Sequence, residues 1–287
     1  MSIVIDGKGT AANLRSELKI IVQDAINQGK RVPGLAVILV GEDPASQVYV
    51  RNKVKACAEV GITSLHHQLP ADTSQETLLT LIEELNNNTK VDGILLQLPL
   101  PKGLDADACL LAISPDKDVD GFHPENVGRL SLGLPGFVSC TPAGVMELLQ
   151  RYNLSPSGKK AVIVGRSNIV GRPLALLLTQ NTPFANATVT ICHSRTQDIA
   201  KECREADFIF LALGKANFLT ADMIKSGAVI IDVGINRTEN GLVGDANYAS
   251  VAPKALAITP VPGGVGPMTI AMLLKNTVQS WQKRLAN

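Results

Sequence analysis

Three polar residues in the first half of the chain, Tyr49, Lys53 and Gln97, have types and positions suited to catalysis. Tyr49 and Lys53 are four residues apart in a stretch with helical periodicity, so their side chains share one helical face. If that face borders a cleft, the amine and the phenol are available to a substrate; an ordinary surface contact is the alternative. Gln97 stands near the end of the apolar run GILLQL, and parallel sheets carry functional groups at the carboxyl ends of their strands.

Two carboxylates, Asp118 and Asp120, lie in the turn-like segment KDVDGFHP beside Gly121. Acidic residues in turns usually accept hydrogen bonds from their own backbone, and a binding role is the alternative. The local pattern does not decide between these two roles.

The stretch VIVGRSNIVGRP, residues 162–173, is a candidate phosphate-binding loop. Gly165 and Gly171 allow tight turns and a close approach of the backbone to a phosphate. A helix beginning near Ile169 would direct its free N–H groups and the positive end of its dipole toward a pyrophosphate. The G-x-G-x-x-G fingerprint is incomplete, so a plain strand-to-helix turn is the alternative.

The end of the next strand favours NADP over NAD as the cofactor. NAD-dependent enzymes place Asp or Glu there to bind the ribose 2′-hydroxyl, whereas the segment TICHSRT has no acidic residue. Arg166 and Arg195 are suited to pairing with a 2′-phosphate, and Ser194 is suited to hydrogen bonding with it. Two solvated arginines at loop edges are the alternative. We interpret His193 as a loop residue and not as a catalytic base.

Alternating helices and strands must position these groups in the first half of the chain. The first expected helix has an apolar face of Leu14, Leu18, Ile21, Val22 and Ile26. In the second, Asp43 is the expected N-cap, Pro44 takes the first helical position and Gly61 ends the helix. Residues 116–130 read as a polar turn region. The expected helices are 10–29, 43–61, 74–88 and 104–113, and the expected strands are 35–41, 63–69 and 93–98.

The second half repeats the alternation after a linking helix at 140–152. Continuous apolar strands separated by helices predict an α/β fold in which helices cover parallel sheets. Residues 258–269, rich in Pro and Gly, read as a shaped loop before a closing amphipathic helix at 267–285. The expected strands are 160–165, 187–192, 207–213 and 228–234.

Composition excludes several classes of protein. The chain has 287 residues, 45% of them hydrophobic, which is enough for one large or two ordinary domains. A net charge of +1 and an aromatic content of 3% argue against nucleic-acid binding. The polar start and the lack of an apolar run of ~20 residues predict neither a signal peptide nor a membrane span. Five scattered cysteines without a C-x-x-C pair indicate a reducing cytoplasm, and we expect no disulfide framework and no metal site.

Several multi-residue motifs together carry a family resemblance. The chain resembles the methylenetetrahydrofolate dehydrogenase/methenyltetrahydrofolate cyclohydrolase family, in its compact two-activity form. The matching motifs follow the family's order and account for nearly the whole chain. They are YVRNK (49–53), GILLQLPLP (93–101), KDVDGFHPENVGRL (117–130), CTPAGV (140–145), GRSNIVGRP (165–173) and PVPGGVGPMT (260–269).

The resemblance implies a function with two steps. The family oxidises 5,10-methylenetetrahydrofolate with NADP and then hydrolyses the methenyl product to 10-formyltetrahydrofolate in the same cleft. Hydride departure from a carbon between two nitrogens leaves a delocalised cation, so placement of the nicotinamide can suffice for that step. Hydrolysis differs, because a water must lose a proton and a ring nitrogen must later gain one.

The resemblance also assigns catalytic roles in the first half of the chain. Lys53 matches the lysine that handles protons, and partial desolvation beside a cationic intermediate favours the neutral amine that this role needs. Gln97 matches the residue that orients this amine, and Asp120 matches the carboxylate that anchors the pterin. Tyr49 matches an aromatic residue that packs on the benzoyl part of the folate and helps to hold the lysine.

In the second half the resemblance assigns cofactor and substrate contacts. The resemblance implies that NADP contacts Gly165, Arg166, Ser167, Ser194 and Ile235. The charge argument above adds Arg195 to these contacts. The implied wall near the folate and the nicotinamide is Pro262, Gly263 and Gly264.

The resulting prediction is two α/β lobes with a cleft between them. A folate-binding catalytic domain comprises residues 1–140 and the C-terminal helix 267–287, and a Rossmann-like NADP-binding domain comprises 141–266. Tetrahydrofolate derivatives are the expected substrates of a cytoplasmic homodimer. One alternative is another two-domain NADP-dependent dehydrogenase, similar to shikimate dehydrogenase. A second alternative is a non-catalytic NADP-binding regulatory module.

Overall fold

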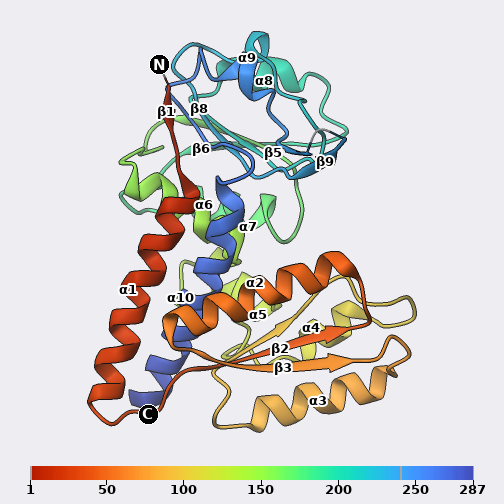
Figure 1. Cartoon of the computed structure of the whole chain (residues 1–287). Coiled ribbons are helices and arrows are strands. Elements are labelled where there is room, and N and C mark those ends of the chain that lie inside the picture. Colours follow the sequence, from red (N-terminus) through yellow and green to blue (C-terminus); the bar gives the residue numbers. More distant parts are fainter. Residues whose placement is uncertain (1, 240, 287) are drawn as a thin grey trace. The chain divides into compact units, whose positions relative to one another are not determined.

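The chain forms two compact units in the computed structural model, which describes residues 2–239 and 241–286 (Figure 1). The six-stranded unit comprises Met1–Ala11 and Thr141–Thr269, and the three-stranded unit comprises Ala12–Cys140 and Ile270–Asn287. The predicted boundary placed residues 1–11 and 267–269 with the first half of the chain. The structure groups residues 2–11 and 267–269 with the six-stranded unit, where strand β1 pairs with β11 although the two strands are far apart in sequence.

The three-stranded unit is built on a parallel sheet in the order β3-β2-β4. Its central strand β2 is buried along its whole length, as expected for a strand covered on both faces. Helices α2 and α3 lie on opposite faces of the sheet (Figure 1). The elements are α1 (Gly7–Asn27), β2 (Gly34–Val40), α2 (Pro44–Val60), β3 (Thr63–Leu69), α3 (Gln75–Asn87), β4 (Gly93–Leu96), α4 (Ala106–Ala112) and α5 (Pro124–Ser131).

The ends of helix α2 are set by the residues that the sequence indicated. The Asp43 carboxylate accepts a hydrogen bond from the Ser46 backbone N–H at 2.7 Å, and Pro44 is the first helical residue. Gly61 ends the helix with φ 91°, a left-handed conformation that glycine adopts without steric cost. The predictions of this N-cap, first residue and C-cap are confirmed.

Two local predictions in this unit are wrong. Ile21 is 40% exposed, so the buried face of α1 is narrower than the predicted apolar stripe. Helix α5 forms inside the segment that read as a turn region, with Pro124 first and the His123 ring accepting from the Glu125 N–H. Its eight residues are too short and too polar for apolar periodicity to reveal a helix.

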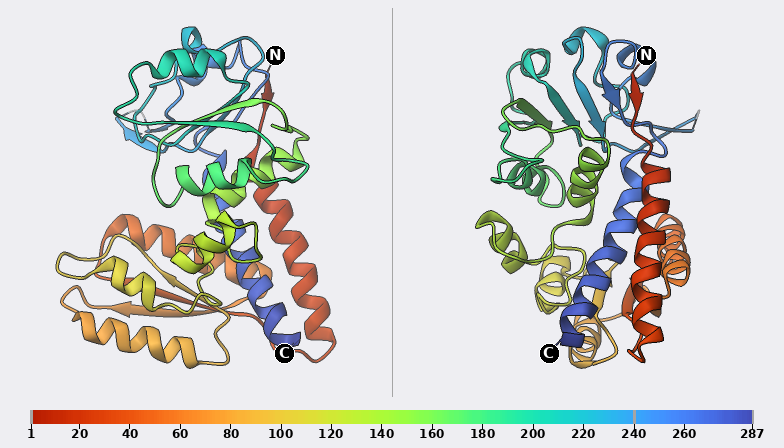
Figure 2. Two further views of the ribbon diagram at one scale, coloured as in Figure 1. Left: turned by 180° about the vertical axis from the view of Figure 1, so that it is seen from behind. Right: turned by 90° about the vertical axis from the view of Figure 1, so that its left-hand side faces the viewer.

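The six-stranded unit contains a sheet in the order β1-β11-β8-β7-β5-β6, and every pair in it is parallel. Strand β5 pairs with β6 on one side and with β7 on the other. The strands that follow β5 in the chain are therefore added on opposite sides of it, which makes β5 a topological switch point. Open α/β sheets bind ligands at such a switch point. Helices α6 and α7 cover one face, and α8 and α9 cover the other (Figures 1 and 2).

Helices α1 and α10 both begin in the six-stranded unit and continue into the three-stranded unit. The elements are β1 (Ile3–Val4), α6 (Cys140–Arg151), β5 (Lys160–Val164), α7 (Gly171–Leu178), β6 (Thr188–Cys192), α8 (Ile199–Glu205), β7 (Phe208–Leu211), a 3₁₀ turn (Ala221–Met223), β8 (Val229–Asp232), β9 (Asn236–Thr238), β10 (Gly241–Val243), α9 (Tyr248–Val251), β11 (Ala257–Ile258) and α10 (Val265–Ala286). Helix α7 begins at Gly171, two residues later than predicted. No helix in the described ranges is both long and apolar enough to cross a membrane.

Candidate functional site

Lys53 and Gln97 meet in the three-stranded unit, from α2 and from the residue directly after β4. The Lys53 amine donates a hydrogen bond to Gln97 Oε1 at 3.0 Å. Gln97 is itself held in place: its side-chain N–H donates to the Leu98 carbonyl at 2.7 Å, and its backbone N–H donates to the Ile38 carbonyl at 2.9 Å. The amide oxygen is thereby fixed toward the amine.

Tyr49 lies one turn before Lys53 on α2 and is 49% exposed. An aromatic ring that stays open to solvent beside a fixed amine offers a flat apolar surface for a ligand ring. The structure thus places the predicted Tyr49 and Lys53 on the same helix, one turn apart, as their spacing indicated.

Asp120 lies near Lys53 and beside the thiol of Cys140. Burial raises the pKa of the Asp120 carboxyl, while the positive charge of Lys53 and a hydrogen bond from Cys140 act in the opposite direction. Burial and the negative charge of Asp120 raise the pKa of the Cys140 thiol well above its ordinary value. The thiol therefore stays protonated and serves as a donor.

The turn that carries Asp120 is held by its neighbour Asp118. The Asp118 carboxylate accepts from the backbone N–H groups of Phe122 at 3.2 Å and His123 at 2.8 Å, and from the Asn126 side chain at 2.9 Å. Burial raises the pKa of Asp118, and these hydrogen bonds oppose the rise. Asp118 thus has the backbone-binding role that turn chemistry predicts, and Asp120 is left for another purpose.

Sequence reasoning missed two residues that support this turn. The Asn276 amide on α10 donates to the Val119 carbonyl at 2.8 Å, and Cys140 Sγ lies 3.4 Å from the same oxygen. Both residues are far from Asp120 in the sequence, and neither belongs to a local pattern that indicates such a role.

In the six-stranded unit, two glycines allow the predicted loop to fold tightly. Gly165 follows β5 with φ 138°, and a Cβ there would collide with the Ala212 carbonyl after β7. A Cβ at Gly171 would collide with the Gly165 carbonyl. The Ser167 hydroxyl accepts from the Val170 N–H at 3.2 Å and so shapes the turn before α7.

The two arginines beside this loop, Arg166 and Arg195, are exposed. Arg166 follows β5, and Ser194 and Arg195 follow the adjacent strand β6, so all three lie at one edge of the sheet. Among the residues that the structure describes, the Arg166 and Arg195 guanidinium groups have no hydrogen-bond or ion-pair partner. The His193 ring accepts from the Arg195 backbone N–H at 3.1 Å, consistent with a loop residue.

A cavity of about 140 Å³ brings Ile235 together with Pro262, Gly263 and Gly264. Ile235 follows β8 and is 47% exposed, whereas residues 262–264 belong to the turn before α10. The structure thus places a predicted cofactor contact beside the predicted wall residues.

Two buried carboxylates that sequence reasoning missed organise the loops around this cavity. Asp232 accepts from the backbone N–H groups of Gly234, Asp245 and Ala246 at 2.9, 3.1 and 2.7 Å. Burial, aided by the charge of Asp245, raises the Asp232 pKa to about 6. Asp245 in turn accepts from the backbone of residues 213–215 and from the Asn236 side chain.

Together, the described geometry defines a class of protein. One unit holds an oriented amine near a partly buried carboxylate, and such groups can transfer protons. The other has a glycine turn and free arginines at the switch point of a parallel sheet, which is typical of nucleotide binding. These features define a two-domain α/β nucleotide-dependent enzyme.

Comparisons with known proteins identify the family. Residues 5–120 match the tetrahydrofolate dehydrogenase/cyclohydrolase catalytic domain, and residues 139–285 match the NAD(P)-binding domain of the same family. The "Bifunctional protein FolD" of Desulfovibrio desulfuricans is 72% identical over 284 residues, covering 99% of this chain and 100% of that protein.

Solved structures agree with this match. The bifunctional FolD methylenetetrahydrofolate dehydrogenase/cyclohydrolase of Campylobacter jejuni is 51% identical with a TM-score of 0.96, covering 99% of this chain and 100% of that one. The FolD enzyme of Trypanosoma brucei, solved with NADP cofactor and an inhibitor, is 38% identical with a TM-score of 0.92, covering 100% and 99% of the two chains.

The chain belongs to the tetrahydrofolate dehydrogenase/cyclohydrolase family. It is a bifunctional enzyme that acts on methylenetetrahydrofolate, so the predicted family, α/β two-domain fold and enzyme class are confirmed. The family match decides against the shikimate-dehydrogenase-like alternative and against a non-catalytic module.

Proposed function

We propose that this protein oxidises 5,10-methylenetetrahydrofolate with NADP and hydrolyses the methenyl product to 10-formyltetrahydrofolate, with Lys53 as the residue that moves protons in the hydrolysis. The observation that carries this proposal is the hydrogen bond from Lys53 to a fixed Gln97, close to the partly buried carboxylate of Asp120. An oriented amine next to an anchoring carboxylate suits a pterin whose one-carbon unit must react with water.

In the oxidation, NADP supplies the hydride acceptor. The C–H electron pair leaves the methylene carbon, and the two flanking nitrogens share the positive charge that remains. No protein group accepts a proton in this step, so the task of the protein is to hold the reacting carbon in place. Tyr49, with its exposed ring, and Asp120 are the groups we assign to that task.

In the hydrolysis, the chain's own side chains act on a water. Gln97 Oε1 accepts one N–H of Lys53, which leaves the lone pair of the neutral amine free to take a proton from the attacking water. The water oxygen forms a bond to the methenyl carbon as its proton passes to Lys53. The resulting ammonium then returns a proton to the ring nitrogen as the carbon–nitrogen bond breaks, while the hydroxyl oxygen forms the formyl C=O and releases its own proton to solvent.

Asp120 is proposed to anchor the pterin. As a carboxylate it accepts from both the ring N–H and the exocyclic amino group, a bidentate contact that fixes the orientation of the ring. The Cys140 thiol lies beside the Asp120 carboxylate and donates to the Val119 carbonyl at 3.4 Å, so it helps to hold the turn that carries Asp120 before the pterin binds.

NADP is proposed as the cofactor, held by Gly165, Arg166 and Ser167 with Ser194 and Arg195, and by Ile235 at the nicotinamide end. Two unpaired guanidinium groups at the ends of β5 and β6 suit a 2′-phosphate. The T. brucei relative, solved with NADP, supports the same choice. The turn Pro262–Gly264 is proposed to border the nicotinamide and the folate from the cavity that it shares with Ile235.

The decisive experiment compares Lys53→Met with Lys55→Met, an exposed lysine on the same helix. With methylenetetrahydrofolate and NADP, Lys53→Met should form NADPH while the methenyl absorbance accumulates, because hydrolysis falls by about 10²–10⁴-fold. Lys55→Met should behave like the unmodified enzyme. Near-normal hydrolysis by a folded Lys53→Met variant would contradict the role of Lys53.

The quaternary state is proposed to be a homodimer. Strand β3 pairs only with β2 among the described residues, so its outer edge presents unpaired backbone groups that a second copy can satisfy. Sedimentation equilibrium should give about twice the chain mass of 30.4 kDa. A concentration-independent mass of one chain would refute the dimer.

The cytoplasm is proposed as the compartment. All five cysteines are free and buried, as expected for a protein that folds under reducing conditions. Fractionation of the source cells, with enzyme activity followed in each fraction, tests this assignment.

A further inference from the structure

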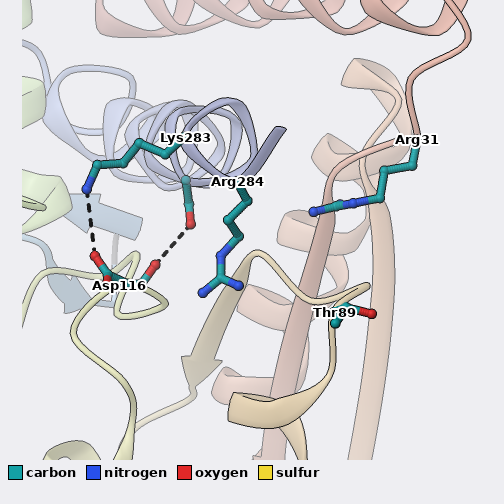
Figure 3. Close-up of a pocket in the computed structure, with 6 residues that line it drawn as sticks. Arg31, Thr89, Asp116, Lys283 and Arg284 are labelled. Carbon is teal, nitrogen blue, oxygen red and sulfur yellow. Dashed lines mark hydrogen bonds and ion pairs between the residues drawn. The ribbon is translucent and has the colours of Figure 1, made fainter. Parts of the chain in front are cut away.

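The three-stranded unit contains a second cavity, formed by residues other than those of the proposed catalytic site. Its volume is about 520 Å³. Figure 3 shows the side chains of Arg31 and Arg284 directed into one space, from the segment before β2 and from the last turn of α10. The lining residues are Arg31, Thr89, Asp116, Ser280, Lys283 and Arg284.

Arg31 is anchored and still has donors to offer. Its guanidinium makes a bidentate contact with the buried Asp92 at 2.6 and 2.7 Å and donates to the Val32 carbonyl at 3.2 Å. These bonds use only part of its fork of N–H groups. The Asp92 oxygens are committed to Arg31 and to the Gly34 N–H at 2.9 Å, so this carboxylate is not available to other cations.

Arg284 has no hydrogen-bond or ion-pair partner among the described residues. It lies close enough to the buried Lys117 for the two positive charges to act on one another: burial, and then the charge of Arg284, lower the Lys117 pKa to about 8. The Lys117 amine donates to the Leu85 and Asn88 carbonyls, each at 2.8 Å, and no acidic side chain of residues 2–239 or 241–286 forms an ion pair with it.

Asp116 opposes the positive charge only weakly. Its side chain is 71% exposed and its contact with Lys283 is 3.6 Å long, and exposed ion pairs of this kind are easily exchanged. Ser280 donates to the Asp116 backbone carbonyl at 3.0 Å, so that carbonyl already has a donor. Three of the lining residues, Arg31, Lys283 and Arg284, are cationic, and Asp116 is the one acidic residue among the lining residues.

We propose that this cavity, with Arg284 at its centre, binds a small multivalent oxyanion of the phosphate class. Two guanidinium forks and a flexible ammonium match the geometry of phosphate oxygens, and the Thr89 hydroxyl adds a donor at the rim. The volume lies within the range of small-molecule sites and exceeds what one phosphate ion fills, so the ligand carries two phosphates or one phosphate with an organic part. The proposal does not depend on the folate chemistry.

The protein carries its own reporter for this site. Its single tryptophan, Trp281, lies on α10 between Ser280 and Lys283, and its indole N–H donates to the Arg31 carbonyl at 3.0 Å. An anion that draws Arg31 and Arg284 together alters the surroundings of this indole, so tryptophan fluorescence should follow binding.

The test is a titration with inorganic pyrophosphate, measured by calorimetry and by Trp281 fluorescence. Ionic strength is kept constant with a chloride salt, and NADP is present at saturation so that the nucleotide loop is occupied. One saturable site per chain is expected. Arg284→Gln should weaken binding about tenfold or more, and Lys283→Gln about threefold or more, because each removes a charge-assisted contact.

Lys19→Gln is the matched control, since it removes an exposed positive charge that does not line the cavity. Its affinity should stay within about twofold of the unmodified protein. Lys283 is 54% exposed, so Lys283→Gln tests the site even if Arg284→Gln folds poorly. Absence of saturable binding under NADP, unchanged affinity in a folded Arg284→Gln or Lys283→Gln variant, or an equal loss in Lys19→Gln each overturns the proposal.

Discussion

The two proposed functional regions are held together in different ways. In the three-stranded unit, side chains position side chains: Gln97 fixes Lys53, and Cys140 contacts Asp120. In the six-stranded unit, the backbone provides the shape through Gly165 and Gly171, while Arg166 and Arg195 lie exposed without partners in the described structure.

The difference follows from the two kinds of chemistry. Proton transfer requires donor and acceptor atoms placed within hydrogen-bonding distance, so its groups are oriented beforehand. A phosphate is bound by backbone N–H groups and by cations that can become ordered as it arrives, so the unbound loop needs space more than it needs fixed side chains.

The largest effect is expected from a change in the glycine loop of the six-stranded unit, whose shape the backbone provides. Gly165→Ala puts a methyl group against the Ala212 carbonyl at a φ of 138°, which should cost about 2–4 kcal/mol of stability. NADP affinity should fall about 100-fold or more, while folate affinity is retained. Calorimetric titrations with each ligand and a urea unfolding curve measure both effects.

Gly227→Ala is the control for that change, because Gly227 also has a positive φ, 80°, but open space around its Cβ position. It should lose about 1 kcal/mol of stability and keep its NADP affinity. Equal losses of NADP affinity in both variants would show that close packing at Gly165 does not matter for the cofactor.

The next effect tests the region built from side chains. Asp120→Asn removes the proposed bidentate acceptor, and the folate KM should rise about 10–100-fold with little change in the NADP KM. Because burial raises the Asp120 pKa, folate affinity of the unmodified enzyme should decline on acidification at a higher pH than an ordinary carboxyl would cause. Asp107→Asn, on the exposed side of α4, is the control. Equal losses of folate and NADP affinity in Asp120→Asn would argue against a pterin anchor.

A smaller effect is expected from removing the positive charge of Arg166, one of the two exposed arginines beside the glycine loop. Arg166→Gln should reduce NADP affinity about tenfold and leave NAD affinity within about twofold, because only NADP carries the 2′-phosphate. The loss should shrink as salt is raised. Steady-state kinetics with both cofactors measure it, with the exposed Arg237→Gln as control. A parallel loss for NAD and NADP would remove the proposed 2′-phosphate contact.

The smallest expected effect concerns the buried carboxylates of the six-stranded unit. The folded-state Asp232 pKa is raised to about 6, so the native state binds a proton more readily than the unfolded state at mildly acidic pH. The stability of the unmodified protein relative to Asp232→Asn should therefore rise as the pH falls below about 6, by about 1 kcal/mol over the first pH unit. Urea unfolding of both proteins across that range measures the difference, and a difference that does not change with pH would contradict the raised pKa.

Local patterns predicted much of the fold and the candidate site. The apolar runs that became β2, β5, β7 and β8, and the capping residues Asp43 and Gly61, act on neighbouring residues and can be recognised without knowledge of the fold. The Tyr49–Lys53 spacing on α2 is of the same kind. The family resemblance, carried by whole motifs, supplied the roles that spacing alone left open.

Other features could not be predicted from local sequence. Strands β1 and β11 have two residues each, and β1 is placed only by its pairing with the far end of the chain. The Cys140 contact with Asp120, and the Asn276 contact with Val119, likewise join distant segments. The roles of Asp232 and Asp245 could not be predicted either. Their carboxylates accept hydrogen bonds from the backbone of residues 213–215, 234 and 245–246, and no local pattern indicates these contacts.

The sequence by itself determined which segments become helices and strands and which residue types are available for chemistry, because these depend on side-chain periodicity and capping over a few residues. Only the tertiary structure decided that Gln97 Oε1 faces Lys53, that burial raises the pKa of Asp120, and that Arg31 and Arg284 share one cavity. Hydrogen-bond geometry, desolvation and the field of nearby charges arise only when residues far apart along the chain are brought within a few ångströms of each other.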